Sequence, residues 1–359
     1  MSKLNFFSGP AVLPASVMQQ AADAIHNFDN TGLSILEISH RSKQFVKVMD
    51  EARALVKELM GLNANYEVLF LHGGALSQFH MVPMNLLNAN ETASYFDTGT
   101  WAHGALTEAK LFGNVHIACS SKDKNYTYIP REYNIATGSK YLHLTSNNTI
   151  YGTQINTPYL NQIIDTDTPI VCDMSSDIFS RQLNYNKFAL IYAGAQKNAG
   201  AAGTTMVILN KDILGTAKRP IPKMLDYSRH IGADSMLNTP SVFAVYVSYL
   251  TLKWIKEQGV ANLEAANQRK ADKLYAAIDG SSLYKGTVEK DSRSQMNVCF
   301  LLNDETLNDK FNAYAEQHDV LGLKGHRSVG GFRASIYNAM PESGVDTLIE
   351  VMKEFERMA

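Results

Sequence analysis

The chain has 359 residues, of which 45% are hydrophobic and 19% charged, a composition typical of a globular protein with a large core. Its 33 basic and 35 acidic side chains give a net charge of −2, which excludes a global attraction to nucleic acid or an anionic membrane. The three cysteines show no disulfide or metal-ligand spacing, and no apolar run reaches the length of a signal peptide or a membrane span. We therefore expect a cytoplasmic protein without a metal site.

Helices and strands alternate over the first part of the chain. Amphipathic spacing predicts helices over residues 14–28, 42–60, 99–112 and 241–258. Apolar runs predict strands over residues 66–71, 92–96, 114–118, 141–145, 169–173, 190–193 and 205–209. Because these strands are apolar throughout and alternate with helices, the expected fold class is α/β, with a mostly parallel central sheet covered by helices.

The remainder of the chain has a different character. Two charged amphipathic helices are predicted at about 263–278 and 304–318, strands near 296–302 and 331–335, and a last helix from about Ser343. This pattern indicates a smaller α+β domain. We expect a large domain of residues 16–258 and a small domain formed by residues 1–15 with residues 259–359.

A lysine in a turn of small residues is the most informative feature. Lys197 lies in the run AGAQKNAG, residues 193–200, between two predicted strands. Small neighbours let a bulky group approach the backbone, and desolvation there would favour the neutral amine that Schiff-base chemistry requires. A lone lysine at such a turn is more often exposed to solvent.

Asp173 favours the Schiff-base interpretation of Lys197 over an exposed lysine. It ends the preceding buried strand at the edge where α/β sheets bind ligands. An aspartate in that place can pair with the pyridine nitrogen of pyridoxal phosphate (PLP), although a helix N-cap is an equally good interpretation of Asp173 alone.

Three further segments suggest contacts to such a cofactor. The Gly73-Gly74 turn follows a strand and opens a helix whose N–H groups could bind phosphate, although a plain tight turn explains most such pairs. It matches neither nucleotide-binding glycine motif. Trp101 could stack on a planar ring or fill the core, and Thr149 offers a hydroxyl at a polar turn.

Basic residues gather in two places in an otherwise neutral chain. His40-Arg41 precedes a predicted helix, and the segment 324–333 contains Lys324, His326, Arg327 and Arg333. Arginine captures carboxylate or phosphate through paired hydrogen bonds, so two anion sites would suit a small phosphorylated acid. A solvated basic loop is the competing interpretation.

Together these segments resemble the phosphoserine aminotransferase family, of PLP fold type I, over the whole chain. The resemblance is carried by FFSGPA at residues 6–11, SHRS at 39–42, YAGAQKN at 192–198, KGHR at 324–327 and GGFRASIYNA at 330–339. It implies reversible transamination of 3-phosphohydroxypyruvate with L-glutamate to O-phospho-L-serine and 2-oxoglutarate, in serine biosynthesis. It also implies conversion of 3-hydroxy-2-oxo-4-phosphooxybutanoate to 4-phosphohydroxy-L-threonine, in vitamin B6 biosynthesis.

The resemblance implies a role for each candidate residue. Lys197 would hold one PLP per subunit as a Schiff base and move protons, Asp173 would hold the pyridine nitrogen, and Trp101 would stack on the ring. Further cofactor contacts would come from Ala75, Leu76, Thr149 and Gln196, and, across a homodimer interface, from Asn238 and Thr239. Substrate phosphate or the glutamate side chain would be bound by His40, Arg41, His326 and Arg327, and the α-carboxylate by Arg333.

Leu76 departs from the family pattern. Bacterial members often have GGGRGQ where residues 73–78 here are GGALSQ, so only the backbone of Leu76 could contact phosphate. The main alternative is another aminotransferase of the fold, such as serine–glyoxylate aminotransferase, which needs no phosphate site. Cysteine desulfuration needs a mobile cysteine, whereas Cys299 lies in an apolar run. A catalytically silent PLP- or anion-binding protein is disfavoured by the Lys197 and Asp173 pair.

Overall fold

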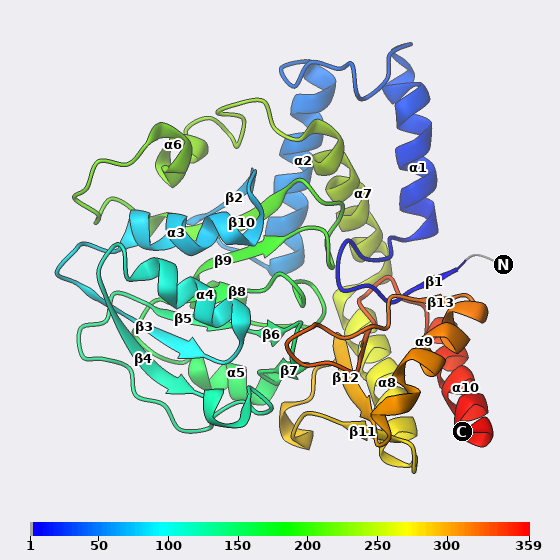
Figure 1. Cartoon of the computed structure of the whole chain (residues 1–359). Helices are drawn as coiled ribbons and strands as arrows, with labels where there is room; N and C mark the ends of the chain where they lie inside the picture. The colour runs from blue at the N-terminus through cyan, green and yellow to red at the C-terminus, as the bar shows by residue number, and fades with distance from the viewer. Residues whose placement is uncertain (1–2) are drawn as a thin grey trace.

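The computed structural model describes residues 3–359 and is built around two sheets of unequal size (Figure 1). The larger sheet has seven strands in the order β2-β10-β9-β8-β5-β3-β4. Its strands are β2 (Tyr66–Leu71), β3 (Thr92–Asp97), β4 (Asn114–Ser120), β5 (Leu142–Thr145), β8 (Ile170–Asp173), β9 (Phe188–Gly194) and β10 (Thr205–Asn210). β10 is the one strand that runs opposite to the other six, so the predicted, mostly parallel α/β sheet is confirmed.

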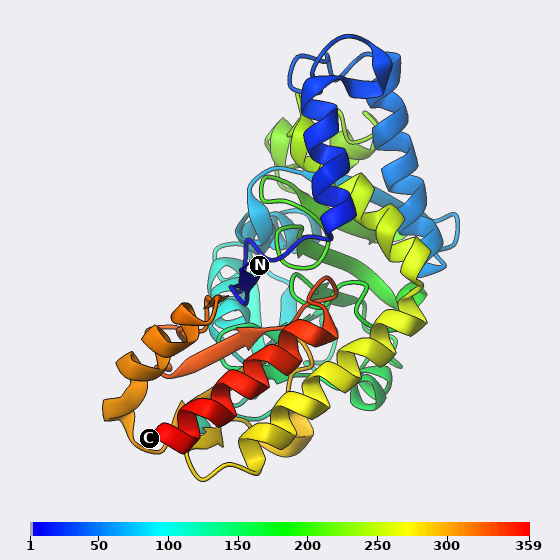
Figure 2. The same ribbon diagram turned by 90° about the vertical axis from the view of Figure 1, so that its right-hand side faces the viewer.

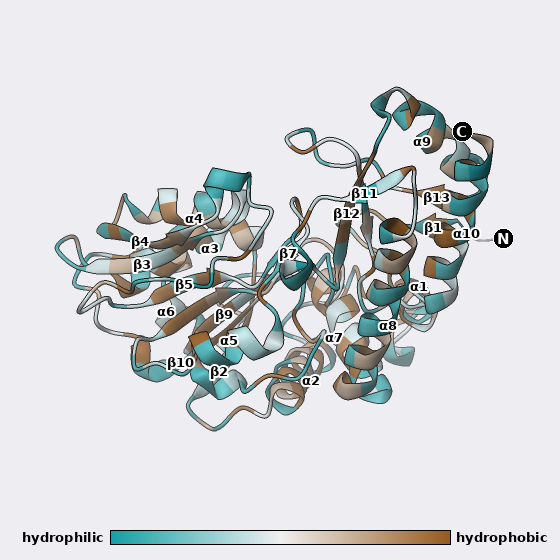
Figure 3. Ribbon diagram, turned by 90° about the horizontal axis from the view of Figure 1, so that it is seen from below, coloured by the Kyte–Doolittle hydropathy of each residue, from teal (hydrophilic) through white to brown (hydrophobic). Residues whose placement is uncertain are grey.

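Helices cover both faces of this sheet. One face packs against α2 (Lys43–Met60), α5 (Thr157–Ile163) and α7 (Val242–Gln258), with α1 (Ala15–His26) outside α7. The other face packs against α3 (Gly74–Leu86), α4 (Thr100–Ala109) and α6 (Tyr227–Ile231). Successive strand residues point to opposite faces, and in β2 Val68 and Phe70 pack towards α2 while Leu69 and Leu71 pack towards α3. Double coverage therefore explains the unbroken apolar runs, which Figure 3 shows as brown strands.

The smaller sheet is antiparallel and has its own aromatic core. It contains β11 (Tyr284–Gly286), β12 (Asn297–Leu302) and β14 (Phe332–Ser335), covered by α8 (Val260–Asp279), α9 (Asn308–Gln317) and α10 (Glu342–Met358). Helices α8 and α10 pack side by side (Figure 2). Phe311 is fully buried and its ring contacts the rings of Tyr284, Phe300, Phe332 and Phe355.

The N-terminal segment lies against this smaller sheet before the chain enters α1. β1 (Leu4–Asn5) pairs in parallel with β13 (Val320–Leu321), and the fully buried Phe6 joins the aromatic core. Further along, Ala11 N donates a hydrogen bond to Gln196 O, 2.9 Å away. The segment thus connects the smaller sheet with the turn that contains Lys197.

Short elements escape the sequence patterns. The predicted helices and strands are present to within a few residues, but α5, α6, β11, β13 and the hairpin of β6 (Asn147–Asn148) with β7 (Thr153–Gln154) were not predicted. These pieces are too short to establish a period. The helix predicted from 304 begins later, because Asp304 caps a separate 3₁₀ turn at Glu305–Leu307. The other 3₁₀ turns are Phe28–Asn30, Lys122–Lys124, Tyr185–Lys187, Lys211–Ile213, Lys223–Leu225 and Lys290–Ser292. No helix within residues 3–359 is both long and apolar enough to cross a membrane.

Replacing Phe311 by alanine should show whether the smaller sheet unfolds independently of the larger one. The lost ring leaves a cavity, and the free energy of unfolding should fall by about 3–5 kcal/mol. Hydrogen exchange should accelerate in residues 259–359 and leave the strands of the larger sheet protected. The control Leu111→Ala, at a side chain 74% exposed, should change neither quantity. Uniform acceleration in both sheets would show a single cooperative unit.

His143 should make stability pH-dependent. Its ring is buried, stacks on Tyr95, and places Nε2 2.9 Å from the Tyr192 hydroxyl; burial lowers the His143 pKa to about 3. Since the unfolded histidine takes up a proton near pH 6.5 and the folded one does not, stability is lost as the pH falls from 6.5 towards 3. The loss attributable to His143 at pH 5 is about 2 kcal/mol. Denaturant unfolding of His143→Gln should show a shallower pH slope than the wild type over this range, and an unchanged slope would contradict the burial of a neutral His143.

Candidate active site

A cavity of about 170 Å³ opens at the carboxyl edge of the larger sheet, where α/β proteins bind ligands. Three connections reach it: the turn from β2 into α3, the end of β8, and the turn after β9. Trp101 of α4 completes the wall. The lining residues are Gly73, Gly74, Ala75, Leu76, Phe79, Trp101, Asp173, Ser175, Gln196 and Lys197. The fold thus brings together residues that the sequence places more than a hundred positions apart.

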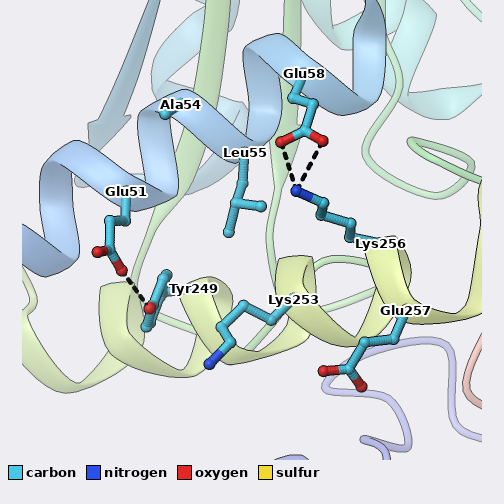
Figure 4. Close-up of a pocket in the computed structure, with 8 residues that line it drawn as sticks. All are labelled: Glu51, Ala54, Leu55, Glu58, Tyr249, Lys253, Lys256 and Glu257. Carbon is cyan, nitrogen blue, oxygen red and sulfur yellow. Dashed lines mark hydrogen bonds and ion pairs between the residues drawn. The ribbon is translucent and has the colours of Figure 1, made fainter.

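A larger hollow of about 600 Å³ lies between α2 and α7 but has different chemistry (Figure 4). Both acidic side chains that α2 contributes are engaged by α7: Lys256 Nζ lies 2.7 Å from Glu58, and the Tyr249 hydroxyl donates to Glu51. Neither a glycine turn nor a buried ionisable side chain lines it. The cavity at the sheet edge is therefore the candidate active site.

The amine of Lys197 is held inside this cavity. Nζ donates a 2.8 Å hydrogen bond to Thr149 Oγ1 and lies 6.0 Å from the centre of the Trp101 ring. Burial lowers the Lys197 pKa; the nearby Asp173 charge opposes the shift, and Arg333 adds to it. Gly9 packs against the lysine stem, since a Cβ there would lie 3.3 Å from Lys197 Cγ. The surroundings favour a neutral, positioned amine.

Asp173 presents one oriented carboxylate oxygen. The side chain is 5% exposed, and Oδ1 accepts hydrogen bonds from Ser175 N at 2.9 Å and from Ser175 Oγ at 2.6 Å. Burial raises the pKa of the Asp173 carboxyl, while Lys197 and Ser175 oppose that rise. No protein group among residues 3–359 donates to Oδ2. A ligand in the cavity can therefore bind that oxygen.

The start of α3 is suited to an anion. Gly73 and Gly74 have φ of +91° and +67°, and no side chain caps the helix, so its first N–H groups face the cavity without a partner from a capping residue. A Cβ on Gly73 would fall 1.8 Å from Ser77 Oγ, which shows how closely the turn is packed. The Leu76 side chain is 59% exposed, so its backbone is the part placed for phosphate.

Arg333 connects the smaller sheet to the site. Its Nη1 donates to Thr149 O at 3.2 Å, and its Nη2 donates to Ser8 Oγ at 2.8 Å. The Arg333 guanidinium is thereby held beside the hydroxyl that accepts from Lys197. Sequence reasoning missed Ser8 and Ser175: Ser8 stood in a noted motif without a role, and the Asp-Met-Ser spacing was the only signal for Ser175.

Comparisons with known proteins identify the family. The sequence profile described as aminotransferase class-V matches residues 4–348. A phosphoserine aminotransferase of Flavobacterium johnsoniae is 56% identical over 358 residues, 99% of each chain. The phosphoserine aminotransferase structure from Bacillus circulans subsp. alkalophilus superposes with a TM-score of 0.95 at 44% identity, over 99% of each chain. This chain belongs to the phosphoserine aminotransferase family.

The family assignment fixes the fold as PLP fold type I and the cofactor as pyridoxal phosphate. A PLP-bound phosphoserine aminotransferase from Trichomonas vaginalis has a TM-score of 0.90 at 34% identity, covering 98% of this chain and 99% of that one. The cavity fits this cofactor. The uncapped start of α3 suits its phosphate, Asp173 Oδ2 suits a protonated ring nitrogen, and the Lys197 amine suits its aldehyde.

The remaining predicted residues of the family site lie outside this cavity. His326 and Arg327 are on the loop between β13 and β14, where His326 Nδ1 lies 2.7 Å from Ser328 Oγ, and burial and two arginine charges lower the His326 pKa. His40 and Arg41 precede α2. Asn238 Nδ2 donates to Thr239 O, which lies 3.1 Å from His72 Nε2, next to the Gly73 turn. A single chain brings none of these six to the cavity wall.

The Gly73 turn offers a test of the phosphate site. Gly73→Ala should weaken PLP binding by about tenfold or more, because the added Cβ displaces Ser77 and the N–H groups at the start of α3. Equilibrium dialysis of PLP against the apoprotein measures this. Gly138→Ala is the matched control, since φ there is +73° with open space around it, and it should retain wild-type affinity. Equal losses in both variants would assign the effect to backbone strain alone.

Proposed function

We propose that this enzyme transfers the amino group between L-glutamate and 3-phosphohydroxypyruvate, giving 2-oxoglutarate and O-phospho-L-serine. One observation carries the proposal: Lys197, Asp173 and the uncapped start of α3 surround a single cavity beside Arg333. The 56% identity to a phosphoserine aminotransferase over the whole chain supports the substrate pair.

Lys197 is proposed as the group that moves the proton. When bound, PLP supplies an electron sink conjugated with the substrate's amino group. With PLP bound, the Lys197 amine would act as the base that removes the proton from Cα of the amino acid and then as the acid that returns it. Thr149 Oγ1, 2.8 Å from Nζ, orients the amine for both transfers.

Asp173 and Trp101 are proposed to hold the ring. Asp173 Oδ2 keeps a proton on the pyridine nitrogen, while the two bonds from Ser175 to Oδ1 prevent the carboxylate from turning away. Trp101 lies on the cavity wall, where its face can cover the ring. Ala75 and Leu76 supply backbone N–H groups for the phosphate, and Gln196 lines the same wall.

Anion recognition is proposed to involve two subunits. Arg333 binds the α-carboxylate, and His40, Arg41, His326 and Arg327 bind the phosphate or the glutamate side chain. Because none of these four lines the cavity of one chain, we propose that the site is completed in a homodimer, with Asn238 and Thr239 reaching the partner's cofactor phosphate. We also propose a cytoplasmic location, where Cys119, Cys172 and Cys299, all unpaired here, stay reduced.

Removing the Lys197 amine should nearly abolish turnover. Lys197→Ala should lower kcat about a thousandfold or more, because no other base stands at that position. The coupled steady-state rate with L-glutamate and 3-phosphohydroxypyruvate measures it. Lys187→Ala, which breaks only an exposed ion pair with Asp165, should keep the wild-type rate. Wild-type-like activity of Lys197→Ala, purified free of host enzyme, would contradict the proposed role.

Absorbance titration of the holoenzyme tests the substrate. O-phosphoserine should bleach the visible band of the bound cofactor at concentrations where serine leaves it intact, because only the former engages the phosphate-binding residues. Equal bleaching by both compounds would favour a serine–glyoxylate type of aminotransferase. Absence of a band after addition of PLP would contradict cofactor binding altogether.

A further inference from the structure

Lys270 is a buried lysine outside the cavity. It lies in the middle of α8 and is 1% exposed, which is rare for this residue type. Its Nζ donates to the carbonyl oxygens of Ile336 at 3.0 Å, Tyr337 at 2.7 Å and Met340 at 3.1 Å. An ammonium has three N–H groups, whereas a neutral amine would turn a lone pair towards one of the carbonyls. The site is therefore built for the charged form.

This charge has no carboxylate partner. Within the described chain no acidic oxygen lies in ion-pair range of Lys270, and Glu342, the acid whose field reaches it, is bound by Arg269 and Lys273. Burial lowers the Lys270 pKa to about 7. Burying an ammonium group is unfavourable unless protein hydrogen bonds replace those it made to water. The three carbonyl oxygens provide these bonds and so stabilise the buried Lys270 side chain. A methionine would fill similar space without that cost.

The three carbonyls belong to the turn Ile336–Met340, which touches the active site on two sides. On one side, the Tyr337 hydroxyl donates to Ser8 O at 2.8 Å, and Ser8 Oγ accepts from Arg333. On the other side, Asn338 N donates to Asn198 Oδ1 at 3.0 Å, next to Lys197. Asn338 Nδ2 also donates to Phe179 O, in the loop after Asp173.

We propose that Lys270 is a positioning residue: by holding the turn Ile336–Met340, it sets the placement of Arg333 and of the segment after Lys197. The turn joins the end of β14 to the start of α10, and Lys270 of α8 holds it through hydrogen bonds to its carbonyl oxygens. The effect on substrate rests on the proposed function, because Arg333 is taken there as the binder of the α-carboxylate. The expected effect of Lys270 on the conformation of the turn Ile336–Met340 does not depend on the proposed function.

The holoenzyme variant Lys270→Met tests this role. It should raise the KM for O-phosphoserine about tenfold while kcat stays within about twofold, because a displaced Arg333 weakens carboxylate binding without removing the Lys197 base. Hydrogen exchange should accelerate in residues 332–340 and 6–11. The control Lys273→Met, on the same helix but exposed, should change neither. A fall in kcat at constant KM, as lost folded enzyme produces, would overturn the proposal.

A second variant decides the outcome if Lys270→Met does not fold. Tyr337→Phe removes the hydroxyl that donates to Ser8 O and accepts from Asn297 Nδ2, and it should raise the same KM by about threefold. Where both variants fold, the double variant should show less than the product of the two effects, since they lie on one path. An unchanged KM in Tyr337→Phe would overturn the link to Arg333. Failure of the wild type to act on O-phosphoserine would contradict the proposed function instead, while exchange in residues 332–340 would still report on Lys270.

Discussion

Desolvation of the Lys197 amine is the constraint on which the rest of the site depends. An exposed lysine keeps its proton well above neutral pH, whereas here burial lowers the Lys197 pKa, with Nζ beside Thr149 and Trp101 and the lysine stem packed against Gly9. The enclosure comes from several separate segments, so it forms only when the larger sheet, the β14 strand and the N-terminal segment are all in place. Catalytic competence is in this sense a property of tertiary packing.

The same packing gives the two carboxylate oxygens of Asp173 different surroundings. Ser175 occupies Oδ1 through its backbone and its hydroxyl, which leaves Oδ2 as the oxygen that can face a ring nitrogen. Burial alone would favour a protonated carboxyl, but the neighbouring lysine and the two serine bonds favour the carboxylate. Burial and the charge of the neighbouring group therefore act in opposite directions on the pKa of both Lys197 and Asp173.

Sequence reasoning reached the larger sheet through strong local signals, whereas it assigned the centre of the site through the family resemblance, because Lys197 and Asp173 each have an ordinary structural interpretation when taken alone. Buried strands such as β8 and β9 are unbroken apolar runs, and Lys197 and Asp173 stand at their ends. Ser8 and Ser175 have no comparable signal, since a serine in a loop is common. Lys270 has no sequence signal either: it lies on a charged amphipathic helix, but its side chain is buried and donates to carbonyls 66 to 70 residues away. Carbonyls are present at every residue and so leave no trace in a sequence.

The parallel pairing of β1 with β13 has a consequence for the order in which the protein is built. Leu4 and Asn5 are synthesised 316 residues before their partners Val320 and Leu321. At about 5–20 residues per second, the N-terminal segment waits for roughly 15–60 seconds before it can dock. During that time Ser8 cannot take its place beside Arg333. A nascent chain can therefore form much of its larger sheet before the N-terminal segment has docked, and the surroundings of Lys197 are complete only after Val320, Leu321 and Arg333 have emerged.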